Sequence, residues 1–213
     1  IINESVEITL TADATAPCAA EAVSSLTLTI QPVAFSDAGL DATICEGETY
    51  TLPALEANTS SLLWTRSGDG TFDDATLISP TYTPGPNDIA NGSVQLTLTG
   101  QPIAPCAVEA ISSMTLTVQH PVTASAGPAT ALLCEGFDYS IPGTSEYADQ
   151  LSWSNNGGDG TFSDATIADP VYTPGAADIA AGSVTLTLTA DPIAPCATTV
   201  TRDVVLNIQL ACF

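Results

Sequence analysis

Apolar and polar residues alternate with period two along several stretches of the chain. Ser93–Thr99 and Ser113–Val118 place Val, Leu or Met at every second position, with Thr, Ser or Gln between them. This alternation predicts strands that bury one face. Apolar residues at Ser61–Thr65 and Thr49–Leu52 predict two further strands, whereas no segment of about 11 residues has a helical period.

Residues that favour turns separate these stretches at short intervals. Clusters rich in Gly, Pro, Asn and Asp occupy positions 68–70, 84–88 and 91–92. About seven short strands in about 89 residues, with a Trp in a central strand, are typical of an immunoglobulin-like sandwich. We therefore predict an all-β fold in which Trp64 and Trp153 belong to the core.

The same motifs recur along the chain. Cys45–Tyr50 (CEGETY) returns 89 residues later as Cys134–Tyr139 (CEGFDY), and Trp64 returns at the same interval as Trp153. The tripeptide Ala-Pro-Cys occurs three times, ending at Cys18, Cys106 and Cys196. A fixed period of this length predicts a tandem array of similar domains.

The register of the repeat predicts three parts. Because Ile1–Leu10 matches Ile89–Leu98, residues 1–31 are predicted to be the last two strands of a preceding immunoglobulin-like repeat. Residues 32–119 and 120–213 are predicted to be two further repeats. This register favours a longer native polypeptide. The alternative is that another chain completes the first part, as in donor-strand complementation.

The charge of the chain is strongly negative. It has 24 acidic residues, two basic ones, and a net charge of −22. Such a charge repels phosphate backbones and anionic lipid surfaces, so we expect neither nucleic-acid binding nor attachment to a membrane surface. No apolar run approaches the roughly 18 residues of a membrane span, so we also expect no membrane insertion.

Several carboxylates lie in or beside the Gly-Asp-Gly turns. We interpret them first as turn residues, with no cofactor. Alternatively, their oxygens could bind Ca²⁺, although no spacing matches an EF-hand loop. These candidate ligands are Asp69, Asp73, Asp74, Asp159 and Asp164.

The chain lacks the combinations of residues that catalysis requires. His120 is the only histidine, and no nucleophile and base recur together in the repeats. We therefore predict that the protein is not an enzyme.

The order of motifs resembles a known family. Cys-Glu-Gly, then Trp, Gly-Asp-Gly-Thr-Phe and Tyr-Thr-Pro-Gly resemble bacterial immunoglobulin-like modules related to the PKD (polycystic kidney disease) domain. The resemblance covers essentially the whole chain. It implies tandem repeats of large surface adhesins of gliding bacteria, exported by the type IX secretion system.

The resemblance implies a secreted protein at the bacterial cell surface. We expect structural stalk or spacer repeats of a surface adhesin or filament, whose partners are neighbouring repeats and possibly other copies in a filament. The alternative is a glycan- or surface-binding module that acts through its loops or a threonine-rich sheet face. Low aromatic content and similar loops in the two full repeats favour the spacer.

Six cysteines in a β-rich chain predict disulfides and an oxidising compartment. In an immunoglobulin-type strand order, Cys45 and Cys106 lie at opposite ends of a sandwich, roughly 25 Å apart at about 3.3 Å per residue. A disulfide needs Cα atoms within about 7 Å. We therefore hypothesise a bond between repeats, from Cys45 to Cys196.

The same rule applies to the remaining cysteines. Cys18 and Cys106 would pair with upstream repeats, and Cys134 would pair downstream or with Cys212. The alternative scheme lies within each repeat and pairs Cys45 with Cys106 and Cys134 with Cys196.

Overall fold

A computed structural model describes residues 5–210 of the protein. The chain divides into two compact units. The first consists of residues 1–41, 50–83 and 94–115, and the second of residues 42–49, 84–93 and 116–213. Because this division does not follow the sequence repeats, the predicted boundaries after residues 31 and 119 stay predictions.

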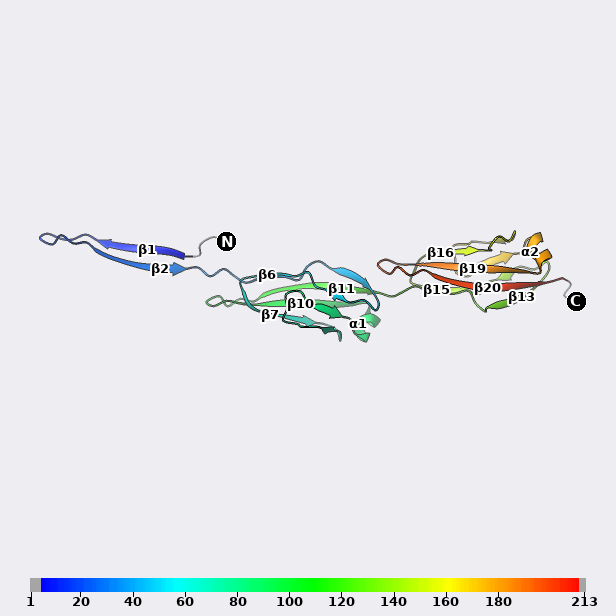
Figure 1. Cartoon of the computed structure of the whole chain (residues 1–213), viewed down its shortest axis with the longest axis horizontal. Helices are drawn as coiled ribbons and strands as arrows, with labels where there is room; N and C mark the ends of the chain where they lie inside the picture. Colours follow the sequence, from blue (N-terminus) through cyan, green and yellow to red (C-terminus); the bar gives the residue numbers. More distant parts are fainter. Residues whose placement is uncertain (1–4, 211–213) are drawn as a thin grey trace. The chain divides into compact units, whose positions relative to one another are not determined.

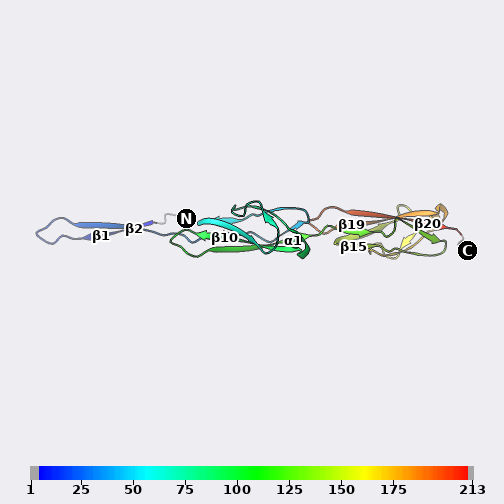
Figure 2. The ribbon, with the colours of Figure 1, turned by 90° about the horizontal axis from the view of Figure 1, so that it is seen from below.

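The first unit begins with a two-stranded antiparallel hairpin. Its strands are β1 (Ser5–Ala12) and β2 (Ala22–Thr29), paired from Ser5 with Thr29 to Ala12 with Ala22. β1 and β2 form a separate two-stranded sheet, drawn in blue in Figures 1 and 2. Every residue of both strands is exposed.

The rest of the first unit contains a second long strand pair. β7 (Thr59–Arg66) pairs antiparallel with β10 (Ser93–Pro102), placing Trp64 opposite Leu98. Both side chains are buried. The short strands are β3 (Phe35–Asp37) with β6 (Leu55–Ala57), and β5 (Tyr50–Thr51) with β9 (Thr81–Thr83) and β8 (Thr71–Phe72).

The second unit contains a four-stranded sheet in the order β13–β20–β19–β16. β13 is parallel to β20, and the other neighbours are antiparallel. The first repeat has the same order, β4–β11–β10–β7. The bounds are β13 (Thr130–Cys134), β20 (Val200–Gln209), β19 (Ser183–Pro192), β16 (Ala148–Ser154), β4 (Ala42–Cys45) and β11 (Ala110–Gln119).

Alternation along β19 builds the core of the second unit. Val184, Leu186 and Leu188 are buried, while the residues between them are not. They pack in a cluster with Trp153, Tyr172, Val204 and Leu206. The remaining short strands are β14 (Tyr139–Ser140), β18 (Val171–Thr173), β17 (Thr161–Phe162), β12 (Thr123–Ser125) and β15 (Thr144–Glu146).

Two helical turns were not predicted from the sequence. α1 (Pro86–Asn91) and α2 (Ala176–Ala181) have six residues each, too few to produce a helical period of apolar residues. The carboxylate of Asp178 accepts a hydrogen bond from the Gly175 backbone N–H at the start of α2. Gly182, with a φ of 74°, ends it in the left-handed conformation that glycine adopts without strain.

Candidate functional site

The site that distinguishes this chain is a disulfide in the second unit, and it begins at the end of β4. Cys45 is the last residue of β4, which pairs parallel with the end of β11 so that Cys45 lies opposite Gln119. The turn that follows is tight: the Glu48 backbone N–H donates to the Cys45 carbonyl over 3.1 Å. Gly47, with a φ of 90°, permits this turn.

The second cysteine lies in the loop between β19 and β20. The Cys196 backbone N–H donates to the Ile193 carbonyl over 3.1 Å, which fixes the cysteine within the loop. Its sulfur lies 3.4 Å from the Gln119 carbonyl oxygen and 3.8 Å from that of His120. Because a disulfide sulfur carries no proton, these are packing contacts.

Cys45 and Cys196 form a disulfide with their Cα atoms 5.0 Å apart. This separation lies within the ordinary range for disulfides. The two residues are 151 positions apart in the sequence, and Cys196 is 7% exposed. The bond therefore links the turn after β4 in the first sequence repeat to a hairpin loop in the second.

The inter-repeat hypothesis predicted this bond between Cys45 and Cys196. The scheme within each repeat is wrong for both cysteines, since it gives each of them a different partner. Its physical fault is that the turn after β4 and the β10–β11 loop lie at the two ends of a long strand: Cys45 is beside Gln119 at the end of β11, whereas Cys106 precedes its start at Ala110.

Polar contacts reinforce the disulfide. The Glu46 backbone N–H donates to the Gln119 carbonyl over 2.9 Å. The Glu46 carboxylate lies 2.9 Å from Nδ1 of His120. The His120 ring also packs on Tyr147, with ring centroids 4.8 Å apart. The sequence alone predicts no partner for His120. The signal available was its position as one extra residue between Gln119 and Pro121, where the earlier repeat has Gln31–Pro32.

The other cysteines differ in state. Cys134 is disulfide-bonded, whereas Cys18 and Cys106 are free thiols. The predicted partner Cys212 lies outside the described residues. The sulfur of Cys106 is 3.4 Å from the Gln31 carbonyl oxygen and 3.8 Å from that of Pro32. These two distances equal those of Cys196 to Gln119 and His120.

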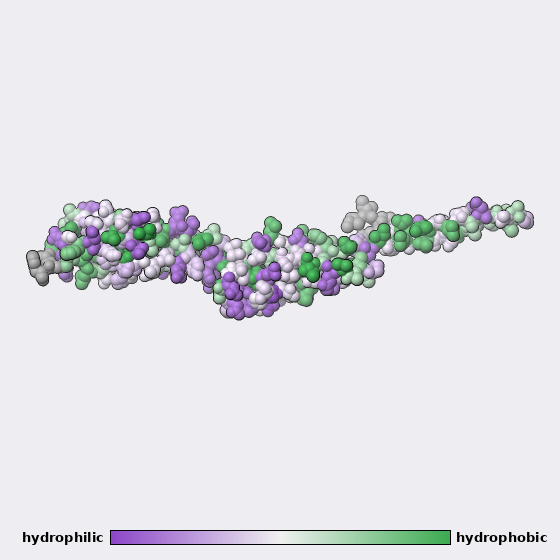
Figure 3. All heavy atoms as spheres, turned by 180° about the vertical axis from the view of Figure 1, so that it is seen from behind, coloured by the Kyte–Doolittle hydropathy of each residue, from purple (hydrophilic) through white to green (hydrophobic). Residues whose placement is uncertain are grey.

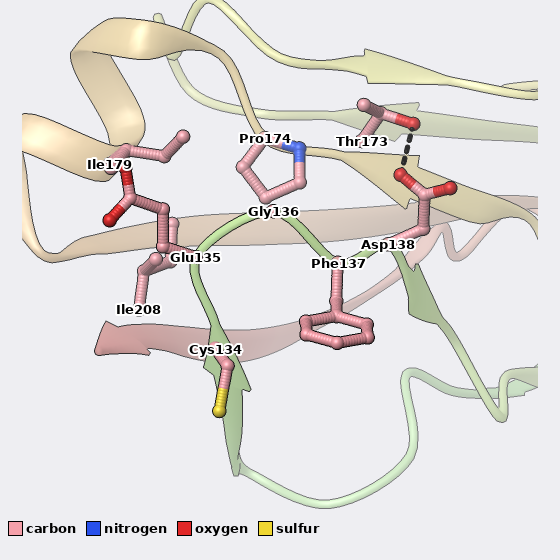
Figure 4. A pocket seen from close by; sticks show the side chains of 9 residues that line it. All are labelled: Cys134, Glu135, Gly136, Phe137, Asp138, Thr173, Pro174, Ile179 and Ile208. Carbon is pink, nitrogen blue, oxygen red and sulfur yellow. Dashed lines mark hydrogen bonds between the residues drawn. The ribbon is translucent and has the colours of Figure 1, made fainter. Parts of the chain in front are cut away.

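Cys134 begins the turn that corresponds to the one after Cys45. Figure 4 shows this turn, which lines a pocket together with Thr173, Pro174, Ile179 and Ile208. The Thr173 hydroxyl donates to the Asp138 carboxylate over 2.8 Å. The Phe137 side chain is 68% exposed, so the turn presents an uncovered aromatic ring.

Carboxylates that the sequence suggested as calcium ligands accept hydrogen bonds from backbone N–H and threonine hydroxyl groups. Asp73 accepts from the N–H of Thr81, and Asp74 and Asp164 each accept from the N–H and hydroxyl of the Thr two residues later. The Thr76 hydroxyl is the main reason that the pKa of Asp74 is lowered. Within residues 5–210 no three metal-binding side chains cluster. Calcium binding stays a prediction.

Asp159 caps the start of α2. Its carboxylate accepts from the N–H groups of Ala177 and Asp178, at 2.9 and 3.2 Å. The bond from the Ala177 N–H is the main reason that the pKa of Asp159 lies below its ordinary value. Asp69 occupies the corresponding position of the first repeat. In the described residues, Asp73, Asp74, Asp159 and Asp164 accept hydrogen bonds from nearby backbone or hydroxyl groups.

A buried tyrosine–aspartate pair lies behind this cap. The Tyr172 hydroxyl donates to the Asp178 carboxylate over 2.6 Å, and Asp178 is 3% exposed. The Gly160 N–H also donates to this carboxylate, over 3.0 Å. The pKa of Tyr172 is raised, mainly because the hydroxyl is buried and secondly because it donates to the neighbouring Asp178 carboxylate. These bonds offset the cost of burying the polar atoms of both side chains.

The threonine-rich strands show ordinary cross-strand pairing. The hydroxyls of Thr97 and Ser113 are 2.8 Å apart, and that of Thr187 donates to Asp203 over 2.6 Å. Such pairs satisfy the hydroxyls within the protein.

Nowhere in the described part of the chain is a helix long and apolar enough to cross a membrane.

Comparison with known proteins identifies the fold. No protein family and no curated protein matches the chain. A three-domain immunoglobulin structure of titin matches 90% of this chain and 70% of its own, with a TM-score of 0.51 and 17% identity. DIP-gamma IG1+IG2 matches 84% of this chain and 99% of its own, with a TM-score of 0.51 and 12% identity.

A cadherin-type structure is similar to the same degree. The Protocadherin GammaB4 extracellular domain matches 97% of this chain and 40% of its own, with a TM-score of 0.53 and 16% identity. At such identities the likeness shows the fold alone. The chain therefore has the all-β immunoglobulin-like fold that its alternation and repeat predict.

Proposed function

We propose that this chain consists of structural stalk repeats of an extracellular surface adhesin or filament, and that it is not an enzyme. The observation that carries the proposal is the Cys45–Cys196 disulfide. A bond from one repeat to the next stabilises the connection between domains, which an isolated binding domain does not require.

The position of the bond is suited to bearing tension. When a chain is pulled at its ends, the load follows the shortest covalent path. The disulfide makes that path run from Cys45 directly to Cys196, so residues 46–195 lie in a loop that does not need to carry load. Without the bond, tension would pass through both repeats. With the bond, most of both repeats would stay folded under the same tension.

The chemistry of the cysteines supports an extracellular location. Structural disulfides persist in oxidising compartments and are rare in the cytosol. Burial of Cys196 also limits the access of reductants to its side of the bond. A net charge of −22 favours solubility of a long, repetitive polypeptide.

The more specific part of the proposal rests on the motif resemblance. PKD-like order of motifs supports a bacterial surface protein exported by the type IX system, with neighbouring repeats as its first partners. Pairing of the Thr97 and Thr187 hydroxyls with the neighbouring strand disfavours the alternative of a glycan-binding threonine face.

The test is non-reducing peptide mapping of the protein isolated from cell surfaces. Only Arg66 and Arg202 offer trypsin sites, so digestion should use proteases that cleave at Asp and Glu. We expect a peptide containing Cys45 linked to one containing Cys196. A Cys45–Cys106 peptide would contradict the proposal and indicate independently stabilised domains.

A further inference from the structure

The β1–β2 hairpin carries an apolar face that nothing in the described chain covers. Val6 lies opposite Leu28 and Ile8 opposite Leu26, which places all four side chains on one face. Each of them is between 49% and 58% exposed. Figure 3 shows hydrophobic side chains gathered along this hairpin.

The repeat register identifies what this face lacks. Ile8 corresponds to Leu96, and Leu26 corresponds to Met114, in the alignment that matches Ile1 with Ile89. Leu96 is 0% exposed and Met114 is 2% exposed. The hairpin therefore has the sequence of two core strands without the strands that bury them. An isolated two-stranded hairpin is marginally stable in water.

A second, independent observation lies at Cys106. This free thiol has the same two sulfur–carbonyl distances, 3.4 and 3.8 Å, that Cys196 has within its disulfide. The Cys106 loop is thus held in the arrangement of a bonded cysteine. By analogy with the Cys45–Cys196 bond, the partner of Cys106 would be the counterpart of Cys45 in another repeat. That cysteine would lie in the same segment as the strands that the hairpin lacks.

We propose that the β1–β2 hairpin is the docking surface for the first strands of another repeat, a segment of the type of residues 32–88. We further propose that the cysteine of that segment which corresponds to Cys45 bonds to Cys106. This inference rests on the proposed tandem array and adds the partner of its first part.

The segment most compatible with the chain precedes the hairpin in the same polypeptide. In the repeat, residues 32–88 end within α1, which leads directly into β10, and β10 is the counterpart of β1. Charge also disfavours a separate molecule. Residues 1–31 contain four acidic and no basic residues, and residues 32–88 contain nine acidic residues and one Arg. Two acidic segments associate more readily when a covalent connection raises their effective concentration.

The disulfide step requires an oxidant, which we take to be a small-molecule disulfide such as oxidised glutathione. One cysteine thiolate attacks it and releases one glutathione thiol. The second cysteine then attacks the mixed disulfide and releases the other. The two protein thiols lose two electrons in total, and the glutathione disulfide gains them.

The experiment places a copy of residues 32–88 ahead of Ile1, which restores the register of a full repeat. The extended and original chains are refolded with oxidised and reduced glutathione. They are then compared by hydrogen exchange and by alkylation of Cys106 with iodoacetamide. We expect exchange of the β1–β2 amides to slow by roughly a hundredfold or more in the extended chain. Alkylation of Cys106 should be lost, and mapping should link it to the added cysteine.

Two variants of the extended chain separate docking from cross-linking. Replacing the added cysteine by Ser should keep the β1–β2 amides protected but leave Cys106 open to alkylation. Ile8→Asp should abolish the protection, because it places a charge on the docking face. Protection of β19–β20 and the Cys45–Cys196 bond report, in the same samples, that the rest of the chain has folded.

Three results would overturn the inference. The first is an extended chain whose β1–β2 amides stay unprotected while β19–β20 is protected. The second is a Cys106 thiol that is still alkylated in the extended chain. The third is an original chain that dimerises through β1–β2, measured by light scattering, because a second copy would then be the occupant. The stalk function fails separately, by absence of the Cys45–Cys196 bond in native material.

Discussion

At the scale of single residues, two cysteines and the groups around them define the connection between repeats. Gln119 is central, because its carbonyl accepts the Glu46 N–H and contacts the sulfur of Cys196. His120 joins the same site through Glu46 and Tyr147. Strand order led to the hypothesis of a Cys45–Cys196 bond, with pairing inside each repeat as the alternative, and the structure has the former. The His120 contacts depend on how the loops fold.

The Cys45–Cys196 bond should contribute measurably to stability. We expect Cys45→Ser and Cys196→Ser each to lower the free energy of unfolding by roughly 2–4 kcal/mol. The double variant should cost little more than either single one, because the same bond is lost. Urea unfolding followed by Trp fluorescence measures this. Cys18→Ser, at an exposed free thiol, is the matched control and should change nothing; equal losses in all variants would contradict the assignment.

The cap of α2 should make stability depend on pH. Hydrogen bonds, first that of the Ala177 N–H, hold the folded-state pKa of Asp159 below 3.8. The unfolded chain therefore binds a proton at this residue at higher pH than the folded one. The stabilisation is present above 3.8 and is lost as pH falls through the folded pKa.

The measurement compares the unfolding free energy of the wild type and Asp159→Asn from pH 7 to pH 2. We expect the wild type to be more stable at neutral pH and the difference to shrink below pH 3.8. The exposed Asp169→Asn serves as the control. A difference that is the same at all pH values would show that Asp159 does not act through its charge.

At the scale of elements, alternation predicted the long strands well and the short ones poorly. β10 and β11 include the stretches with period two. By contrast, β5 has two residues and α1 and α2 have six each, so their existence depends on tertiary contacts and capping. The buried Tyr172–Asp178 pair likewise joins a strand to a helix that the sequence pattern does not reveal.

Equivalent positions in β1 and β10 should respond differently to the same truncation. Leu96→Ala should cost about 2–5 kcal/mol, because Leu96 is fully buried. Ile8→Ala should cost less than about 0.5 kcal/mol, because Ile8 is 49% exposed. Denaturant unfolding of the two variants provides the comparison. Similar losses would mean that the hairpin face is covered in solution.

At the scale of the whole molecule, the repeat is what the sequence revealed most clearly. The recurring CEG and APC motifs predicted tandem immunoglobulin-like domains and, with the strand order, the bond between them. The motifs also identify the type of segment that would complete the first part, which is one similar to residues 32–88.

The central claim is that tension passes through the Cys45–Cys196 bond. The most direct measurement is single-molecule pulling of the chain, held at its two ends, until it is fully extended. Cys45 and Cys196 are 151 positions apart in the sequence. While the bond is intact, the residues between them do not contribute to the length of the extended chain. Breaking it should therefore lengthen the extended chain by about 500 Å, at roughly 3.5 Å per residue.

Cys134 is also disulfide-bonded, so the comparison uses Cys45→Ser/Cys134→Ser, which removes both bonds, and reduced wild type. Both should show the full gain of about 500 Å over the oxidised wild type. Cys134→Ser alone should show none, since the Cys45–Cys196 bond still provides the shorter path. If the oxidised wild type and the double variant extend to the same length, tension does not pass through this bond, and the account of a load-bearing stalk is wrong.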